Sequence, residues 1–171
     1  MSPRRLALVA TELAVGGAER CLTTLACGLP REEFAPMVYS LAPAPSGERA
    51  ALVHALQDAG VPVRFVGAAR SRQLRFAVRE LRAMLREQSP AIVQSFLFHA
   101  NVATALALGK NGPTHFAGAR VAQPRPWRLR VERWATRRVR KMVCVSQAVA
   151  DFYRERAGFD FQRLEVIPNG I

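Results

Sequence analysis

Hydrophobic residues along the chain follow two alternating patterns: short apolar runs, and longer segments with one apolar face. Residues 6–10 are an apolar run, and residues 91–96 are a second, mostly apolar segment, and both have the length of a β-strand. In residues 71–88, apolar positions recur every three or four residues and arginines occupy the opposite side, which is typical of an amphipathic helix. Ser89 and Pro90 then predict the end of this helix, because a residue before proline disfavours helical backbone.

The same alternation continues over the whole chain. We expect strands at 4–9, 35–41, 61–66, 91–96, 114–120, 141–146 and 164–168, and helices at 17–29, 48–60, 71–88, 100–110, 125–140 and 147–158. Strands and helices at this spacing are typical of right-handed βαβ crossovers. The sequence therefore predicts one α/β domain over residues 1–171, with a doubly wound, mostly parallel, Rossmann-like sheet of about seven strands and helices on both faces.

Two adjacent glycines lie where such a sheet binds ligands. Ligands of doubly wound sheets bind beyond the carboxyl ends of the strands, and Gly16 and Gly17 stand between the first expected strand and the next helix. Glycines there permit a close approach of the backbone to a ligand, and a helix N-terminus favours an anion. The chain contains neither the G-x-G-x-x-G nor the G-x-x-x-x-G-K-[ST] motif. From these residues alone, a ligand site and a simple tight turn remain equally open.

Charge and composition narrow the classes of partner. The net charge is +12, which fits nucleic acid, an anionic membrane or phosphate-bearing substrates, and also fits the arginine bias of a GC-rich genome. The arginines are spread over several helices without a helix-turn-helix or an aromatic RNA platform, so we expect no nucleic-acid partner. The three cysteines have neither metal-ligand nor disulfide spacing, and no apolar run has the length of a secretory signal or a membrane span. We expect a cytoplasmic protein without a metal site.

Four longer motifs, in order, carry a resemblance over essentially the whole chain. They are "ALVATELAVGGAER", "IVQSFLFHANVATALA", "FAGARVAQPRPW" and "VCVSQAVADFY…AGF…LEVIPNGI". Together they resemble the N-terminal domain of family-4 retaining glycosyltransferases of GT-B fold. That family has two Rossmann-like domains facing a cleft, of which the N-terminal one binds mainly the acceptor and the C-terminal one the nucleotide-sugar. The family's paired glutamates and most of its donor-phosphate ligands belong to the second domain, which we expect to be absent from this chain.

The resemblance implies the acceptor-side domain of a hexosyltransferase that moves a sugar from a nucleotide-sugar to an acceptor hydroxyl with retention, with no metal or other cofactor. It implies a glycan or a lipid-linked acceptor. Without its C-terminal partner domain, the chain is expected to have little or no activity and to expose an apolar rim that favours a homodimer. The alternative is a stand-alone binding module, without turnover, for a phosphorylated or lipid-linked ligand or an anionic membrane.

The resemblance assigns roles to residues of the first and fourth strand loops. Gly16 and Gly17 match the family's glycine pair in the cleft. His99, in "FLFHAN", matches a histidine that contacts the transferred sugar in some relatives, and is our catalytic candidate. The other interpretation is that His99 packs or caps at the start of a helix. Relatives often have a His-x-His pattern where this chain has Gln94 and Phe96, which weakens the catalytic assignment.

Three further residues are assigned to substrate or phosphate binding. Arg120, after the fifth strand, is expected to hold a phosphate or carboxylate, since its planar guanidinium binds such groups through two hydrogen bonds. Relatives have an acid where this chain has Gln123. Asn101 and Ser146 are included in the site, although a structural role is open for both: Asn101 at the start of a helix, and Ser146 as N-cap of helix 147–157.

The segment 125–141 is strongly basic and has Trp127, Val131 and Trp134 on one helical face. The cations assigned to a membrane or anion surface with the two tryptophans are Arg128, Arg130, Arg137 and Arg138. One interpretation is peripheral attachment to the inner face of an anionic membrane, where aromatic and basic side chains are favoured. The other is a solvated arginine face with both tryptophans packed on the sheet.

Overall fold

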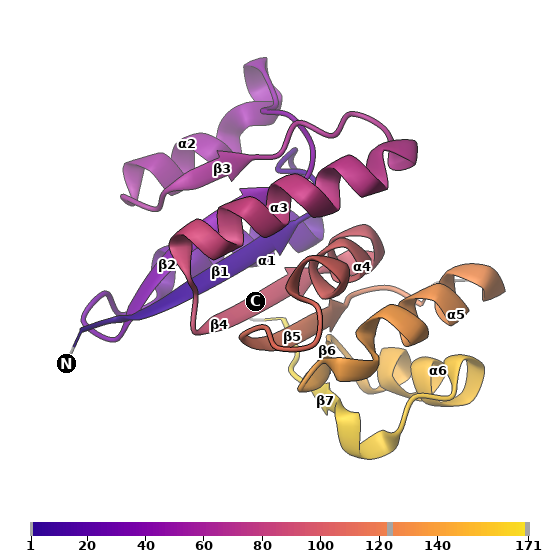
Figure 1. Ribbon diagram of the computed structural model, residues 1–171. Coiled ribbons are helices and arrows are strands. Elements are labelled where there is room, and N and C mark those ends of the chain that lie inside the picture. Colours follow the sequence, from indigo (N-terminus) through magenta and orange to yellow (C-terminus); the bar gives the residue numbers. More distant parts are fainter. Residues whose placement is uncertain (1, 123–124, 170–171) are drawn as a thin grey trace.

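The computed structural model describes residues 2–122 and 125–169. They form a parallel seven-stranded sheet in the order β3-β2-β1-β4-β5-β6-β7 (Figure 1). The strands are β1 (Arg4–Ala10), β2 (Phe34–Ser40), β3 (Val63–Phe65), β4 (Ile92–Phe96), β5 (Thr114–Ala119), β6 (Lys141–Cys144) and β7 (Leu164–Val166). The predicted doubly wound, Rossmann-like sheet is confirmed.

Six α-helices connect the strands. They are α1 (Gly17–Gly28), α2 (Ala51–Asp58), α3 (Leu74–Gln88), α4 (Leu97–Leu108), α5 (Pro126–Ala135) and α6 (Gln147–Ala157). Helix α3 ends as predicted, because Ser89 takes a left-handed conformation (φ 48°) directly before Pro90. Several boundaries differ from the prediction. Helices α2 and α3 begin three residues later than expected, each after a 3₁₀ turn, and β3 is shorter than the expected strand 61–66. Helix α4 begins three residues earlier, at Leu97, and the basic segment divides into α5 and a 3₁₀ turn, η3 (Thr136–Arg138).

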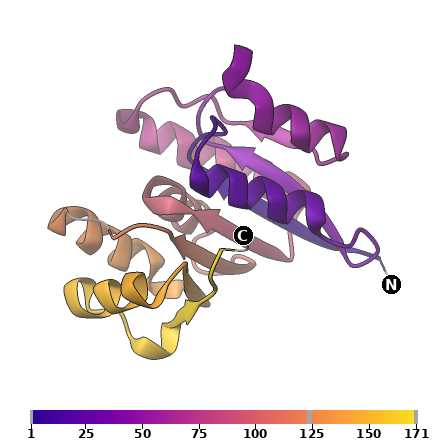
Figure 2. The ribbon, with the colours of Figure 1, turned by 180° about the vertical axis from the view of Figure 1, so that it is seen from behind.

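The helices form two layers around the sheet. Helices α1 and α2 cover one face, where Leu22 and Leu56 pack with Leu8 of β1 (Figure 2). Helices α3 and α4 cover the other face, where Leu81 packs with Val9 and Val93. Helix α6 continues this second layer over β6, and α5 contributes to the same apolar cluster. Helices therefore lie on both faces of the sheet, as predicted from the βαβ order.

The order of the strands fixes the position of the ligand-binding edge. Strands β1, β2 and β3 add in one direction, whereas β4 to β7 add in the other, so the direction reverses between β1 and β4. The loops after these two strands diverge to opposite faces of the sheet and leave a crevice between them. The segments entering this crevice are the loop containing Gly16 and the first turn of α4.

Candidate functional site

A cleft runs along the carboxyl edge of the sheet. It consists of three hollows of about 420, 260 and 220 Å³, and Glu12 lines all three. Thr11, Glu19 and His99 each line two of them. The hollows are therefore one continuous surface, which we call the cleft. Its ionisable lining residues are Glu12, Glu19, Glu48, Arg49, Arg70, His99, Arg120, Arg128 and Tyr153. The cleft therefore combines cations, carboxylates and a histidine at the edge where such sheets bind ligands.

Two arginines line the central part of the cleft. Arg120 follows β5, and its guanidinium lies 5.0 Å from the ring centroid of Phe96 and hydrogen-bonds the side-chain oxygen of Asn169. Arg128 projects from α5, and its guanidinium lies 5.3 Å from the ring centroid of Phe98. The buried Nε of Arg128 has no hydrogen-bond partner in the described part of the chain. Arg128 lines the cleft because α5 packs against α4, and its guanidinium also lies 5.5 Å from the ring centroid of Trp127; its assignment to a membrane or anion surface stays a prediction.

Two carboxylates lie on the α1 side of the cleft. Burial raises the pKa of Glu19, and the nearby charge of Glu12 raises it further, whereas a backbone hydrogen bond and Arg120 act in the opposite direction. Glu19 was not among the predicted site residues. The only sequence signal for it was an acid in the first turn of a helix, and such an acid already suits the helix dipole without any ligand.

Gly16 leaves space for a side chain of the cleft, which is not the role expected for the glycine pair. Gly16 has an extended backbone (φ −156°), and neither glycine has a positive φ. A Cβ at Gly16 would collide with the Glu19 carboxylate, whereas a Cβ at Gly17 would meet no atom within 4 Å. The pair therefore forms no left-handed turn: Gly16 leaves room for Glu19. Ligand binding by the backbone of these glycines stays a prediction.

His99 lies in the first turn of α4 and lines two of the three hollows. Its ring packs edge-on against Phe98, with 5.1 Å between the centroids. Burial lowers the pKa of His99, and the charge of Arg128 lowers it further, so the imidazole is neutral at pH 7. The helix is entered through Leu97, whose positive φ of 69° is unfavourable for a side chain with a Cβ. His99 therefore packs at a helix start, as one interpretation expects, and it also lines the cleft, while its contact with a transferred sugar stays a prediction.

A family assignment follows from the comparison with known proteins. A model of glycosyltransferase family 4 matches residues 15–171. The chain belongs to glycosyltransferase family 4. No curated protein sequence matches it.

Solved structures agree with this family-4 assignment in fold. HepE from Anabaena, solved with UDP, has a TM-score of 0.79 and 21% identity over 98% of this chain. The lipopolysaccharide outer core galactosyltransferase WaaB has a TM-score of 0.71 and 14% identity over 98% of the chain. MurG from Acinetobacter baumannii has a TM-score of 0.66 and 12% identity over 99% of the chain. The family-4 chain spans 44–46% of the length of these three proteins.

Behind the cleft, the family-4 domain contains a fully buried polar network. Asn101 donates hydrogen bonds from Nδ2 to the carbonyl of Gly118 (3.0 Å) and to Oε1 of Glu132 (2.7 Å), and its Oδ1 accepts one from Ser95 (2.7 Å). Because Asn101 is fully buried and its amide is engaged, it does not reach a ligand. This corrects its assignment to substrate binding, and the structural interpretation is confirmed.

Glu132 is the centre of this network. Its two carboxylate oxygens accept hydrogen bonds from Asn101 and, at 2.9 Å, from the hydroxyl of Tyr153, which lines the cleft. Burial raises the pKa of Glu132, while the two hydrogen bonds favour the carboxylate. The sequence did carry a signal: Glu132 is the single acid among the arginines of segment 125–141. Sequence reasoning did not interpret it as buried.

Ser146 has the capping role that was one of its two interpretations. Its hydroxyl accepts a hydrogen bond from the backbone N–H of Val149 (3.3 Å) at the start of α6. Ser146 is not among the residues that line the cleft hollows, so its ligand role stays a prediction. Gln123 lies outside the described residues. Within residues 2–122 and 125–169, no group of three His, Cys, Asp or Glu side chains is arranged to hold a metal ion.

The two tryptophans of α5 are exposed, contrary to one of the two interpretations of this segment. Trp127 and Trp134 are 52% and 55% exposed, and Val131 between them is also exposed. The interpretation in which both tryptophans pack on the sheet is therefore wrong. The buried residues of α5 are instead Leu129 and Glu132. Arg130, Arg137 and Arg138 are exposed, and the guanidinium of Arg137 lies 5.6 Å from the ring centroid of Trp134. No helix in the described ranges is long and apolar enough to cross a membrane.

Proposed function

We propose that this chain forms the acceptor-side wall of the active cleft in a retaining glycosyltransferase, which moves a sugar from a nucleotide-sugar to an acceptor hydroxyl. The observation that carries the proposal is the convergence of Arg120 and Arg128 with Glu19 and the neutral His99 in one cleft. Membership of glycosyltransferase family 4 supports the reaction class. A donor-binding domain faces this wall in the intact protein, and the chain's span of less than half of the related structures supports this arrangement.

The rim of the cleft supports the same arrangement. Val15, Val121 and Ile167 are exposed, and they lie in the segments that follow β1, β5 and β7 at the carboxyl edge. Exposed apolar side chains at a ligand edge are typical of a surface that meets another domain. In the isolated chain, the same rim makes a homodimer the expected alternative partner.

The chemistry assigned to the wall follows from its charges. Nucleotide-sugar cleavage releases a nucleoside diphosphate, and cations in a water-poor site stabilise the developing negative charge. We assign this stabilising positive charge to Arg120 and Arg128 of this domain and to cations of the second domain. No metal ion takes part in the proposed reaction. Glu19, whose pKa is raised by burial, accepts a hydrogen bond from an acceptor hydroxyl. His99 remains neutral and hydrogen-bonds the sugar.

The test uses the full reading frame that contains this chain, expressed with any second domain that it encodes. Transfer from nucleotide-sugars to glycan and lipid-linked acceptors is assayed for the unmodified protein, Arg128→Gln and Arg120→Gln. We expect each variant to lower kcat/KM by about tenfold to hundredfold, since one charge-stabilising group is lost. Arg156→Gln removes the same charge from an exposed position on α6 and is expected to leave kcat/KM within about twofold.

Two results would count against the proposal. If Arg128→Gln and Arg156→Gln behave alike, the cleft cations do not act on the reaction. Turnover by the isolated 171-residue chain would contradict the need for a facing domain. Binding of a phosphorylated or lipid-linked ligand without any transfer by the full protein would favour the alternative, a binding module.

We also propose that the outer face of α5 attaches the protein peripherally to an anionic membrane on its cytoplasmic side. The exposure of Trp127 and Trp134, with the guanidinium groups of Arg128 and Arg137 over their rings, favours this second function, because both side-chain types are stabilised at a lipid interface. In sedimentation with anionic vesicles at low salt, we expect Trp127→Gln/Trp134→Gln to reduce binding about tenfold. Phe161→Gln, which replaces an exposed aromatic residue of another segment, is the matched control. Absence of binding by the unmodified chain at low salt would overturn this assignment.

A further inference from the structure

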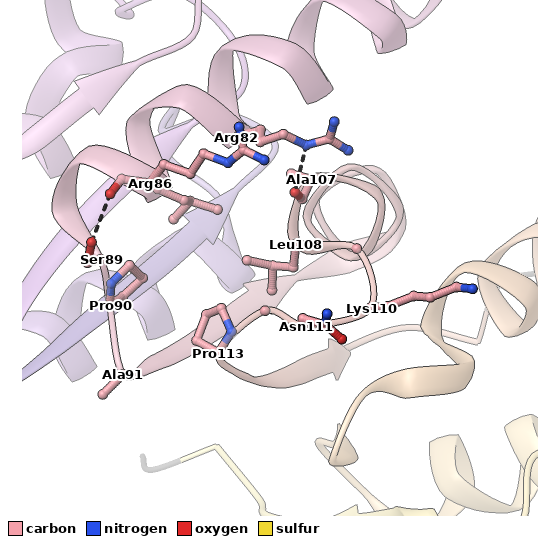
Figure 3. A pocket seen from close by; sticks show the side chains of 13 residues that line it. Arg82, Arg86, Ser89, Pro90, Ala91, Ala107, Leu108, Lys110, Asn111 and Pro113 are labelled. Atoms are coloured by element: carbon pink, nitrogen blue, oxygen red, sulfur yellow. Dashed lines mark hydrogen bonds between the residues drawn. The ribbon is translucent and has the colours of Figure 1, made fainter.

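A second hollow, which we call the groove, lies at the edge of the sheet opposite to the cleft. It encloses about 780 Å³ between the C-terminal ends of α3 and α4 and the segments that lead into β4 and β5 (Figure 3). Its lining includes Arg82, Arg86 and Ser89 from the α3 side, and Lys110 and Asn111 from the α4 side. Since the cleft is at the carboxyl ends of the strands, the groove is a separate site.

All the charged side chains that line the groove are positive. Arg82 and Arg86 are one helical turn apart on α3, and Lys110 belongs to the opposite wall, while none of the lining residues is acidic. Glu87, in the last turn of α3, pairs instead with Arg64 of β3 at 2.7 Å. Like charges one turn apart on a helix repel each other. An anion in the groove removes this repulsion, which favours an anionic ligand.

One of the two arginines is held in place by the fold. Arg82 donates from Nε to the carbonyl of Ala107 (2.9 Å) and from Nη2 to that of Leu106 (2.7 Å), at the end of α4. Figure 3 shows Arg82 and Arg86 reaching from α3 toward this end of α4. Arg86 and Lys110 form no ion pair within the described ranges. The Nη1 group of Arg82 therefore offers a phosphate a donor that is already held in position, and the guanidinium of Arg86 offers a pair of planar donors beside it.

The rest of the groove is apolar. Leu85 and Pro90 come from the α3 side, and Leu108 and Pro113 from the α4 side. In Figure 3, Leu108 and Pro113 lie on the side of the groove below the two arginines. Phosphate ions alone make no use of this surface, whereas a phosphate carried on an apolar body covers it and removes it from water.

We propose that the groove binds a phosphate monoester attached to an apolar body, such as the phosphate of an acidic lipid. The phosphate lies on Arg82 and Arg86, and the apolar part lies on Leu108 and Pro113. The proposal is independent of glycosyl transfer, because the groove shares no lining residue with the cleft.

Three soluble probes separate the two parts of the proposed ligand. Dihexanoyl phosphatidic acid, kept below its micelle concentration, has both parts. Glycerol 3-phosphate has the phosphate alone, and dihexanoyl phosphatidylcholine has the same chains with a zwitterionic head. Titrations of the ¹⁵N-labelled chain by NMR follow the backbone amides of Asn111 and Gly112. We expect phosphatidic acid to shift these amides at a concentration about tenfold lower than either of the other probes.

Arg86→Gln tests the site, and Arg75→Gln is its matched control. Both remove one charge from α3, and Arg75 is exposed and does not line the groove. We expect Arg86→Gln to weaken phosphatidic acid binding about tenfold and Arg75→Gln by less than twofold, with amide spectra elsewhere unchanged. Equal weakening by both variants would overturn the proposal in favour of diffuse charge attraction. If glycerol 3-phosphate binds as tightly as phosphatidic acid, the apolar part of the ligand is not recognised. If phosphatidylcholine binds as tightly as phosphatidic acid, the phosphate monoester is not recognised.

Discussion

The carboxylate of Glu19 lies over Gly16, in the space that a side chain at position 16 would occupy. In the "GGAE" segment, the absence of a side chain at Gly16 leaves a space, and the carboxylate of Glu19 in the first turn of α1 occupies it. Glu19 thereby reaches the cleft and comes within the electrostatic influence of Glu12 and Arg120. The adjacent Gly17 has no such neighbour, so the two glycines have different roles.

A pair of alanine variants separates those roles. In Gly16→Ala, the new Cβ displaces the flexible end of Glu19 toward solvent, so the pKa of Glu19 is expected to fall toward its ordinary value as burial is lost. In Gly17→Ala, the pKa of Glu19 is expected to stay raised, and the free energy of unfolding to increase by about 0.5–1 kcal/mol because alanine favours helix. Carboxyl ¹³C NMR titration measures the pKa, and urea denaturation the stability. A raised pKa of Glu19 in both variants would contradict the displacement.

The buried side chain of Glu132 is expected to stabilise the fold through its hydrogen bonds rather than through its negative charge. Glu132→Ala leaves one N–H of the Asn101 amide and the Tyr153 hydroxyl without a partner and opens a cavity, so it should cost about 3 kcal/mol; the second N–H of Asn101 keeps the carbonyl of Gly118. Glu132→Gln keeps the shape, accepts from Asn101 and donates to the Tyr153 hydroxyl oxygen, and should cost less than about 1 kcal/mol. Both are measured by urea denaturation at pH 7. A glutamine variant as unstable as the alanine variant would mean that the negative charge itself is required.

Acidification is expected to destabilise the domain through His115. Burial lowers the pKa of His115 from 6.5 to about 4, while its Nε2 lies 2.8 Å from Oγ of Ser95. Between these pH values the unfolded chain binds the proton and the folded chain does not, so the free energy of unfolding falls as pH decreases from about 6.5 to 4, by about 3 kcal/mol. The lowered pKa of His99 acts in the same direction, whereas the raised pKa of Glu132 acts in the opposite one.

The measurement is urea denaturation at several pH values for the unmodified chain and for His115→Gln. The variant removes the titrating group, so its stability should change less steeply between pH 6.5 and 5. If both proteins have the same pH dependence, a group other than His115 is responsible for it.

The close approach of β5 to β4 predicts a cost for a methyl group at Gly118. A Cβ there would lie 3.0 Å from the carbonyl oxygen of Ser95, and Asn101 holds the backbone of Gly118 from both its N–H and its carbonyl. Gly118→Ala is therefore expected to lower the free energy of unfolding by about 1–3 kcal/mol. Gly28→Ala, at the end of α1 with no atom within 4 Å of its Cβ, is the control and should not destabilise. The readout is thermal denaturation, and equal midpoints for the two variants would contradict the expected clash.

The sequence predicted the elements well because their signals are local. The stripe of α3 and its end before Pro90 depend on residues adjacent along the chain. The start of α4 at Leu97 was missed, since the positive φ there opposes the local preference of leucine. Arg120 and His99, which the family resemblance singled out, do line the cleft, whereas their roles stay predictions. The cleft position of Arg128, which also lies over Trp127, was not predicted because it depends on the packing of α5 against α4.

The sequence by itself determined the class of fold, the edge of the sheet where the cleft lies, and the resemblance to family-4 glycosyltransferases. Periodicity, strand–helix order and motifs are properties of neighbouring residues, and they survive without knowledge of packing. Only the tertiary structure decided which polar side chains meet: that Glu132 is buried between Asn101 and Tyr153, that Trp127 and Trp134 are exposed, and that Glu19 rests on Gly16. These outcomes depend on the rotation of each helix on the sheet, which is set by contacts between residues far apart in the chain.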